Sequence, residues 1–200
     1  MIIDNPNNPT GRTLLDRQAV ETLIDNTDAL LVIDEAYYEF SGVTFADMVQ
    51  NCPDLAITRT MDKAFSLAGA RVGYAVAGNT FLDALSSFYA FLPQSSLSAA
   101  IEALENPGYM RRNVQRVIEE RERVWRALNE LGAHVHQSTT NFLLVRTEIP
   151  DAVSEFREIG ILVSDLSNQL PPGFIRVSIG TPEENDAFIS AYLRIREAYE

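Results

Sequence analysis

The sequence contains a single lysine, Lys63, among 200 residues, although it contains fifteen arginines. Arginine keeps its proton at any workable pH, whereas a desolvated lysine can lose its proton and attack a carbonyl group. If position 63 needed only a positive charge, arginine would be expected there too. The alternative is a surface lysine retained by chance, because lysine is mostly exposed in proteins. The scarcity of lysine therefore indicates a candidate residue for Schiff-base chemistry.

Cysteine and long apolar runs are also scarce. Cys52 is the only cysteine, which excludes an internal disulfide framework and fits a reducing cytoplasm. The sequence has no apolar run of about 18 residues, so we expect no membrane span. A charged and then apolar leader with a cleavage site is also missing, so we expect no secretory signal. These absences predict a cytoplasmic protein.

Positive charge is in short supply as well. Lysine and arginine number 16 against 28 aspartates and glutamates, which gives a net charge of −12. Nucleic acids and anionic membranes are poor partners for such a chain. The apolar content of 46% is enough to form a core. We therefore expect a globular protein that binds neither nucleic acids nor anionic membranes.

Buried strands alternate with helical patterns in the first half of the chain. Residues 30–33 form a continuous apolar run that ends in Asp34 and Glu35, as is typical of a strand covered on both faces of a parallel sheet. Further strands are predicted over 56–60 and 72–77, and helices after the Thr13 and Asp16 capping pair and over 79–91 and 95–105. This alternation predicts an α/β domain over residues 1–105.

The pattern changes near Asn106, Pro107 and Gly108, where a second, small α+β domain over 106–200 is predicted to begin. Its last helix should start at Thr181 with a capping box, because proline and a capping glutamate follow. The other elements are predicted as a long helix over 109–131, a helix over 151–159, and strands over 134–137, 141–147, 161–164 and 174–179.

The first four residues, Met1 to Asp4, have the pattern of the end of a buried strand that leads directly into a turn. No cap, helix or partner strand precedes them in the sequence. We therefore expect the chain to be the C-terminal part of a larger fold.

Four motifs occur in a fixed order: Asn8 in Asn-Asn-Pro-Thr-Gly, Asp34 in Asp-Glu-Ala-Tyr, Lys63 in Lys-Ala-Phe-Ser-Leu-Ala-Gly with Arg71 eight residues later, and Arg176 in Phe-Ile-Arg-Val-Ser. Together they resemble the fold-type I pyridoxal-phosphate aminotransferases, most closely the histidinol-phosphate aminotransferase group. The resemblance covers essentially the whole chain. It implies the C-terminal part of the large domain, with a mainly parallel sheet and helices on both faces, followed by the small domain.

The resemblance assigns the cofactor, pyridoxal 5′-phosphate, to residues at three of these motifs. Lys63 would form the Schiff base and then move the proton during transamination. Asp34 would keep the ring nitrogen protonated, which makes the ring an electron sink. Tyr37 and Asn8 would hydrogen-bond the phenolic oxygen. A lone aspartate in this position could instead cap the next helix.

Phosphate and substrate ligands follow from the same resemblance. Thr60 and Arg71 resemble the ligands of the cofactor phosphate, because an arginine fork suits a phosphate dianion. Arg176 resembles the arginine that pairs with an acidic group of the substrate. The alternatives are an ordinary surface ion pair for Arg71 and a strand-end surface arginine for Arg176.

The chain departs from the family pattern at two positions. Asp62 stands where these enzymes usually have a serine that helps to hold the cofactor phosphate, and a carboxylate there is repulsive unless it is paired or points away. Ser164 stands where the histidinol-phosphate group commonly has an arginine that grips the substrate phosphate. The family's N-terminal contributions, which include a phosphate-binding turn, a stacking aromatic ring and a tyrosine that crosses the dimer, have no counterpart before Asn5.

The implied function is transfer of an amino group between an amino donor and a 2-oxo acid, with histidinol phosphate and 2-oxoglutarate as the best substrate pair. The alternatives are another amino-acid aminotransferase, a phosphothreonine decarboxylase, and a non-catalytic remnant or one half of a split enzyme. The complete enzyme is expected to be a homodimer. His134 and His136 alternate on a predicted strand and could form a metal pair, but further ligands are missing, so a strand surface is the preferred interpretation. We therefore expect no metal.

Overall fold

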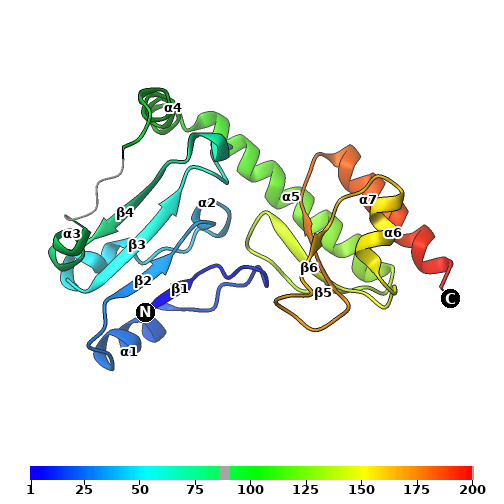
Figure 1. Cartoon of the computed structure of the whole chain (residues 1–200), viewed down its shortest axis with the longest axis horizontal. Helices are drawn as coiled ribbons and strands as arrows, with labels where there is room; N and C mark the ends of the chain where they lie inside the picture. Colours follow the sequence, from blue (N-terminus) through cyan, green and yellow to red (C-terminus); the bar gives the residue numbers. More distant parts are fainter. Residues whose placement is uncertain (86–90, 200) are drawn as a thin grey trace. The chain divides into compact units, whose positions relative to one another are not determined.

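The computed structural model describes residues 1–85 and 91–199, which divide into two compact units (Figure 1). The first unit comprises the described residues of Met1–Asn8 and Arg12–Val114, and the second those of Pro9–Gly11 and Gln115–Glu200. The predicted domain boundary between residues 105 and 106 stays a prediction, because these units are defined by contacts and not by independent folding.

The first unit is an α/β layer built on a four-stranded sheet of order β1-β2-β3-β4. Strands β1, β2 and β3 are parallel, whereas β4 is antiparallel to β3. The elements are β1 (Ile2–Asp4), α1 (Arg17–Asp25), β2 (Leu31–Asp34), α2 (Tyr38–Ser41), the 3₁₀ helix η1 (Ala46–Asn51), β3 (Leu55–Thr60), the 3₁₀ helix η2 (Ala68–Ala70), β4 (Gly73–Ala77), α3 (Asn79–Leu85) and α4 (Gln94–Glu105).

One face of this sheet carries the core of the first unit. Leu31 and Ile33 of β2 lie beside Leu55 and Ile57 of β3 in register, and all four are almost completely buried. Helix α1 covers this face through Val20, while η1 packs into the same cluster. Because side chains alternate along a strand, the next residues, Asp34 and Thr58, belong to the opposite face.

Two predicted helices of this unit differ from expectation. Asp16 is itself the N-cap of α1, since its carboxylate accepts the Ala19 N–H at 2.8 Å, so the helix begins later than the pairing of Thr13 with Asp16 predicts. The helix predicted over 79–91 is present as α3, and residues 86–90 lie outside the described residues.

The second unit packs helices on one face of an antiparallel sheet of order β5-β6-β8-β7. The 23-residue helix α5 contributes residues to both units. No helix of the described residues is long and apolar enough to cross a membrane. The elements are α5 (Gly108–Glu130), β5 (His134–Val135), β6 (Phe142–Arg146), α6 (Ala152–Glu158), β7 (Ser164–Asp165), β8 (Phe174–Ser178) and α7 (Pro182–Glu197).

The core of the second unit lies between this sheet and its helices. Val145 of β6 pairs with Ile175 of β8, and both belong to a cluster with Phe156 of α6 and Phe188 of α7. The rings of Phe156 and Phe188 stack with centroids 5.1 Å apart. Arg176, which follows Ile175, therefore belongs to the face of the sheet that the helices do not cover.

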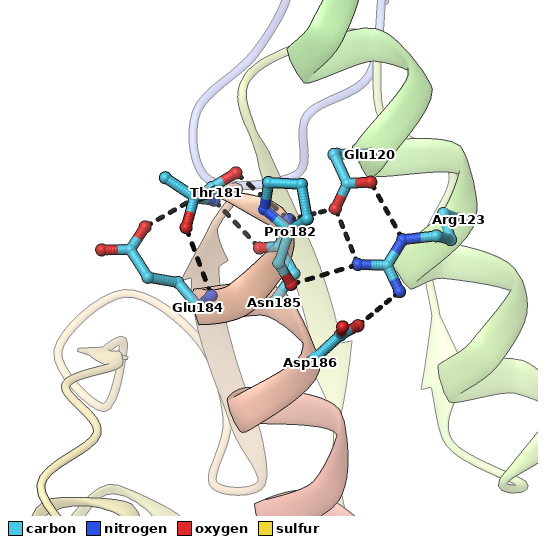
Figure 2. A network of polar contacts seen from close by, with 8 residues as sticks. Glu120, Arg123, Thr181, Pro182, Glu184, Asn185 and Asp186 are labelled. Carbon is cyan, nitrogen blue, oxygen red and sulfur yellow. Dashed lines mark hydrogen bonds and ion pairs between the residues drawn. The ribbon is translucent and has the colours of Figure 1, made fainter.

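The predicted capping box of α7 is confirmed. The Thr181 hydroxyl accepts the Glu184 N–H at 3.3 Å, and the Glu184 carboxylate accepts the Thr181 N–H at 2.8 Å. Beside this cap, the buried Asn185 donates to Glu120 of α5 at 2.7 Å (Figure 2). Arg123 joins the two helices, because it donates to Glu120 and also to Asp186.

Candidate active site

The predicted cofactor residues of the first unit gather at one edge of its sheet. The carboxyl ends of the parallel strands β1, β2 and β3 meet there, and ligands of α/β sheets bind at this edge. The antiparallel strand β4 begins at the same edge, because Gly73 pairs with Thr60. The residues are Asn8 after β1, Asp34 and Tyr37 at and after the end of β2, Thr60 and Lys63 at and after the end of β3, and Arg71 before β4.

The loop after β1 is held by two side chains of its own. Both carboxylate oxygens of Asp4 accept hydrogen bonds, one from the Asn8 N–H at 2.7 Å and one from the Asn7 side chain at 3.0 Å. Asn5 is fully buried, and its side-chain oxygen accepts the N–H groups of residues 14 and 15. This arrangement fixes the backbone at Asn8, which is itself exposed.

Asp34 and Tyr37 lie at the turn between β2 and α2. Asp34 is half-buried, and its carboxylate accepts the Ala36 N–H at 3.1 Å. The main-chain carbonyl of Asp34 accepts the Asn5 N–H at 2.9 Å. The second bond joins the loops that follow β1 and β2. Tyr37 is buried directly before α2.

A buried ion pair behind this turn was missed by the sequence analysis. Glu35 is 1% exposed, and its carboxylate accepts two hydrogen bonds from Arg59, one from the Phe45 N–H and one from the Thr44 hydroxyl. The Arg59 guanidinium also lies 3.6 Å from the centre of the Tyr38 ring. Burial lowers the pKa of Arg59, but its hydrogen bonds to Glu35 and Tyr74 outweigh this effect and raise it. The sequence signal that could have revealed this ion pair is the placement of opposite charges, Glu35 and Arg59, near the ends of two neighbouring strands.

Lys63 lies three residues after the end of β3, in a short turn. Its side chain is exposed, and its carbonyl accepts the Ser66 N–H at 3.0 Å. The hydroxyl of Thr60 accepts the Asp62 N–H at 3.0 Å, which fixes the backbone directly before the lysine. The buried Ala64 follows. The lysine amine is therefore presented to solvent from a turn that is fixed on both sides.

Arg71 is paired with Asp62, the residue that departs from the family pattern. Its guanidinium donates to the Asp62 carboxylate at 2.6 Å and to the Ala68 carbonyl at 3.3 Å. The Arg71 side chain is 75% exposed and the Asp62 side chain 17%. The carboxylate beside Lys63 is thus paired, as it must be if an anion is to bind nearby.

Arg176 belongs to the second unit, where it lies beside the other departure from the family pattern. It pairs with Ser164 across strands β8 and β7, and its guanidinium donates to the Ser164 hydroxyl at 3.1 Å. The guanidinium also lies 5.2 Å from the centre of the Phe142 ring. Ser164 therefore occupies a position from which a longer, charged side chain would adjoin Arg176.

The two histidines remain without a metal assignment. His136 lies 6.2 Å from Phe174 between ring centres, and His134 pairs with Arg146 in the sheet. Within residues 1–85 and 91–199, no three histidine, cysteine, aspartate or glutamate side chains come together as metal ligands.

Comparison with known proteins assigns the chain to a family. The family described as aminotransferase class I and II matches residues 1–191. The chain belongs to this family. Histidinol-phosphate aminotransferase of Thermococcus kodakarensis is 41% identical over 193 residues, which cover 96% of this chain and 54% of that protein. The corresponding enzyme of Sulfurisphaera tokodaii is 38% identical and covers 94% and 53%. The chain thus spans about half the length of the aminotransferases it matches.

Solved structures of two enzymes show the same fold. Histidinol-phosphate aminotransferase from Sinorhizobium meliloti, determined in complex with pyridoxal-5′-phosphate, superposes with a TM-score of 0.87 at 25% identity and covers 100% of this chain and 57% of that one. L-threonine-O-3-phosphate decarboxylase from Porphyromonas gingivalis also gives 0.87, at 27% identity, with 98% and 64% covered. The α/β fold predicted from the motifs is therefore confirmed.

Proposed function

We propose that this chain carries the lysine-bearing part of a pyridoxal 5′-phosphate site in an aminotransferase. The observation that carries the proposal is the position of the single lysine. Lys63 follows β3 at the sheet edge that also holds Asp34 and Tyr37 on one side and Arg71 on the other. An amine, a carboxylate, a phenol and a guanidinium are the donor set that suits a pyridine aldehyde with a phosphate group, so the residues fit this cofactor.

Each residue has a chemical role in this proposal. When bound, the cofactor supplies an electron sink for the charge that develops on the substrate α-carbon. Lys63 Nζ would act first as the nucleophile toward the cofactor aldehyde and, once displaced by the substrate amine, would carry the proton from the substrate α-carbon to the cofactor's C4′ carbon. Asp34 holds a proton on the ring nitrogen, Tyr37 and Asn8 donate to the phenolic oxygen, and Arg71 binds the phosphate with the Thr60 hydroxyl. Arg176 binds the acidic group of the substrate.

The lysine assignment can be tested by covalent labelling. After incubation with pyridoxal 5′-phosphate and reduction with borohydride, peptide mapping should find a pyridoxyl group on Lys63. Lys63→Arg should abolish this label and leave the fold intact, because the positive charge is kept and the nucleophile is lost. In a test on the 200-residue chain, the amino group of Met1 is the only other primary amine, so its labelling measures non-specific reaction. Turnover by Lys63→Arg, or labelling of Met1 alone, would sink the assignment.

The substrate proposal is histidinol phosphate with 2-oxoglutarate. The support comes from the similar histidinol-phosphate aminotransferases, and Arg176 provides a guanidinium for the substrate phosphate. Here Ser164 replaces the second arginine, so one charged group in place of two would meet that phosphate. A charge-assisted hydrogen bond contributes roughly 1.5–3 kcal/mol, so its loss should weaken phosphate binding about tenfold or more. A carboxylate needs only one bidentate arginine and would lose less.

Ser164→Arg should therefore raise selectivity for histidinol phosphate. The measurement is the ratio of kcat/KM for histidinol phosphate to that for an aromatic amino acid, before and after the substitution. The exposed Ser167→Arg adds the same charge just beyond β7 and serves as the control. If the unmodified enzyme already favours the phosphate by orders of magnitude and Ser164→Arg leaves the ratio unchanged, another residue supplies the second contact.

Decarboxylation of a phosphorylated amino acid is the second candidate. It is favoured by the equal structural likeness to the L-threonine-O-3-phosphate decarboxylase and by the single arginine at the proposed phosphate position. Release of carbon dioxide from phosphothreonine, without any need for a 2-oxo acid, would distinguish it from transamination. A complete protein that labels Lys63 but catalyses neither reaction would be a non-catalytic remnant.

The remaining partner assignments are proposals for the complete protein. We propose a cytoplasmic homodimer that acts on small-molecule amino and 2-oxo compounds and binds neither nucleic acid nor membrane. The net charge of −12 supports the last part, because it disfavours contact with polyanions. Sedimentation of the complete protein would test the dimer.

A further inference from the structure

Asp62 contacts both residues that are proposed to bind the cofactor phosphate, Arg71 and Thr60. Its carboxylate lies 2.6 Å from the Arg71 guanidinium, and its side chain is only 17% exposed. Its own N–H donates to Thr60, so its backbone is fixed between the two groups proposed to bind the cofactor phosphate. We propose that Asp62 neutralises Arg71 and thereby weakens the site's preference for the phosphorylated form of the cofactor. This inference rests on the proposed function.

The ion pair sets two opposing effects against each other. Asp62 keeps Arg71 in one orientation, which spares a phosphate ligand some of the cost of ordering that side chain. However, Arg71 is 75% exposed, and ion pairs at such positions contribute little. A phosphate bound to the same guanidinium would bring a dianion close to the Asp62 carboxylate. Like charges that adjoin one guanidinium repel each other, which weakens binding of the phosphate. Repulsion should therefore outweigh orientation.

The consequence is specific to the phosphate group. Asp62 and Arg71 together carry no net charge, so an incoming phosphate meets a neutral pair and not a free guanidinium. Pyridoxal lacks the phosphate but has the same aldehyde and ring, so its reaction with Lys63 should not depend on Asp62. The ratio of the two affinities therefore isolates the effect of Asp62 from any effect on Lys63.

The test measures labelling of Lys63 in the 200-residue chain as a function of ligand concentration, with borohydride trapping and peptide mapping. Pyridoxal 5′-phosphate and pyridoxal are compared in the unmodified chain, in Asp62→Asn, which keeps the side-chain shape, and in Asp62→Ser. Both variants should raise the preference for the phosphorylated ligand about tenfold, which corresponds to about 1.4 kcal/mol. Inorganic phosphate should also inhibit labelling by pyridoxal 5′-phosphate more strongly in the variants than in the unmodified chain.

Asp47→Asn is the matched control. Asp47 forms an exposed ion pair with Arg17 and lies in η1, before β3, whereas Asp62 follows β3. The control changes the net charge equally without touching Arg71, so its ratio should equal that of the unmodified chain. A ratio that is unchanged or lower in both Asp62 variants, while both ligands label Lys63, would overturn the inference alone. A lower ratio would show that Asp62 orients Arg71 for the phosphate. If neither ligand labels Lys63 in any variant, the proposed function fails, and this inference fails with it.

Discussion

Glu35 and Glu39 lie four residues apart after β2, but their surroundings make them different groups. The Glu35 carboxylate is completely enclosed by donors, including the Arg59 guanidinium at 2.8 Å. Glu39 sits in the first turn of α2, where burial raises its pKa above 4.5; a backbone hydrogen bond and the charge of Arg59 partly offset this rise, while the charge of Glu35 adds to it. Glu35 thus holds the turn next to Asp34, whereas ionisation of Glu39 destabilises the folded state.

The raised pKa of Glu39 predicts a pH dependence of stability. The folded state holds this proton more tightly than the unfolded state, so the contribution is fully present below pH 4.5 and is lost as pH rises through the folded pKa. Glu39→Gln removes the loss, so its stability relative to the unmodified chain should increase with pH across that window. Urea unfolding at several pH values, with hydrogen exchange of the β2 and β3 amides, would measure it.

Glu120 supplies the control of opposite sign. Hydrogen bonds from Arg123 and Asn185 lower the pKa of Glu120 below 4.5, although burial acts in the opposite direction. Its contribution is therefore present above pH 4.5 and is lost as pH falls through the folded pKa. Glu120→Gln should destabilise the second unit at neutral pH and lose this effect in acid. Identical pH profiles for the two variants would show that the assigned surroundings are wrong.

At the scale of elements, the cap of α7 is the best-defined local stabiliser. Thr181→Ala removes the hydroxyl that accepts the Glu184 N–H, and the loss of such a cap costs about 1 kcal/mol. The free energy of unfolding should fall by this amount, as followed by the fluorescence of Trp125, the only tryptophan, which lies in α5 of the same unit. Ser190→Ala removes a hydroxyl from the exposed middle of α7 and should not destabilise, because alanine favours a helix. Equal losses in both variants would contradict the role of the cap.

The elements that could be predicted from the sequence are those with a strong local signal. The apolar run of β2 and the capping box of α7 each have one interpretation, and both are present. The short helix α2 and the 3₁₀ helix η1 were missed, because each is stabilised by tertiary contacts such as the buried Phe40 and Met48 and not by a repeating pattern. The strand predicted over 161–164 forms only as Ser164–Asp165, since pairing with β8 decides where it lies.

The candidate site shows the same division between local and tertiary signals. Lys63, Asp34 and Arg71 could be selected from their motifs, and the register of the strands explains why they share an edge. The pairing of Asp62 with Arg71 could not be predicted, because it depends on how the chain returns from η2 into β4. The roles of the site residues stay predictions until Lys63 is labelled.

At the scale of the whole molecule, apolar surface and sheet edges set the behaviour of the chain in isolation. Within the described part, β1 and β4 form the two edges of the first sheet and have no further strand beside them. Ile2 on β1 is 76% exposed, and Tyr74 and Val76 on β4 are each 37% exposed. Edge strands with exposed apolar side chains are sites for pairing between molecules. The similar aminotransferases are almost twice as long, so their additional residues could cover such surfaces and add cofactor contacts.

The last prediction concerns this 200-residue chain studied alone. It should associate in a concentration-dependent manner, as measured by sedimentation velocity, and it should show little transaminase turnover even at high cofactor concentration. Val76→Glu places a charge on an edge strand and should reduce association, whereas the same change at the exposed Leu193 of α7 should not. Turnover should stay low in both variants, because a charge on an edge strand changes association and adds no contact to the cofactor. A monomeric chain with turnover equal to that of its full-length relatives would show that about half of the relatives' length is sufficient for a complete site.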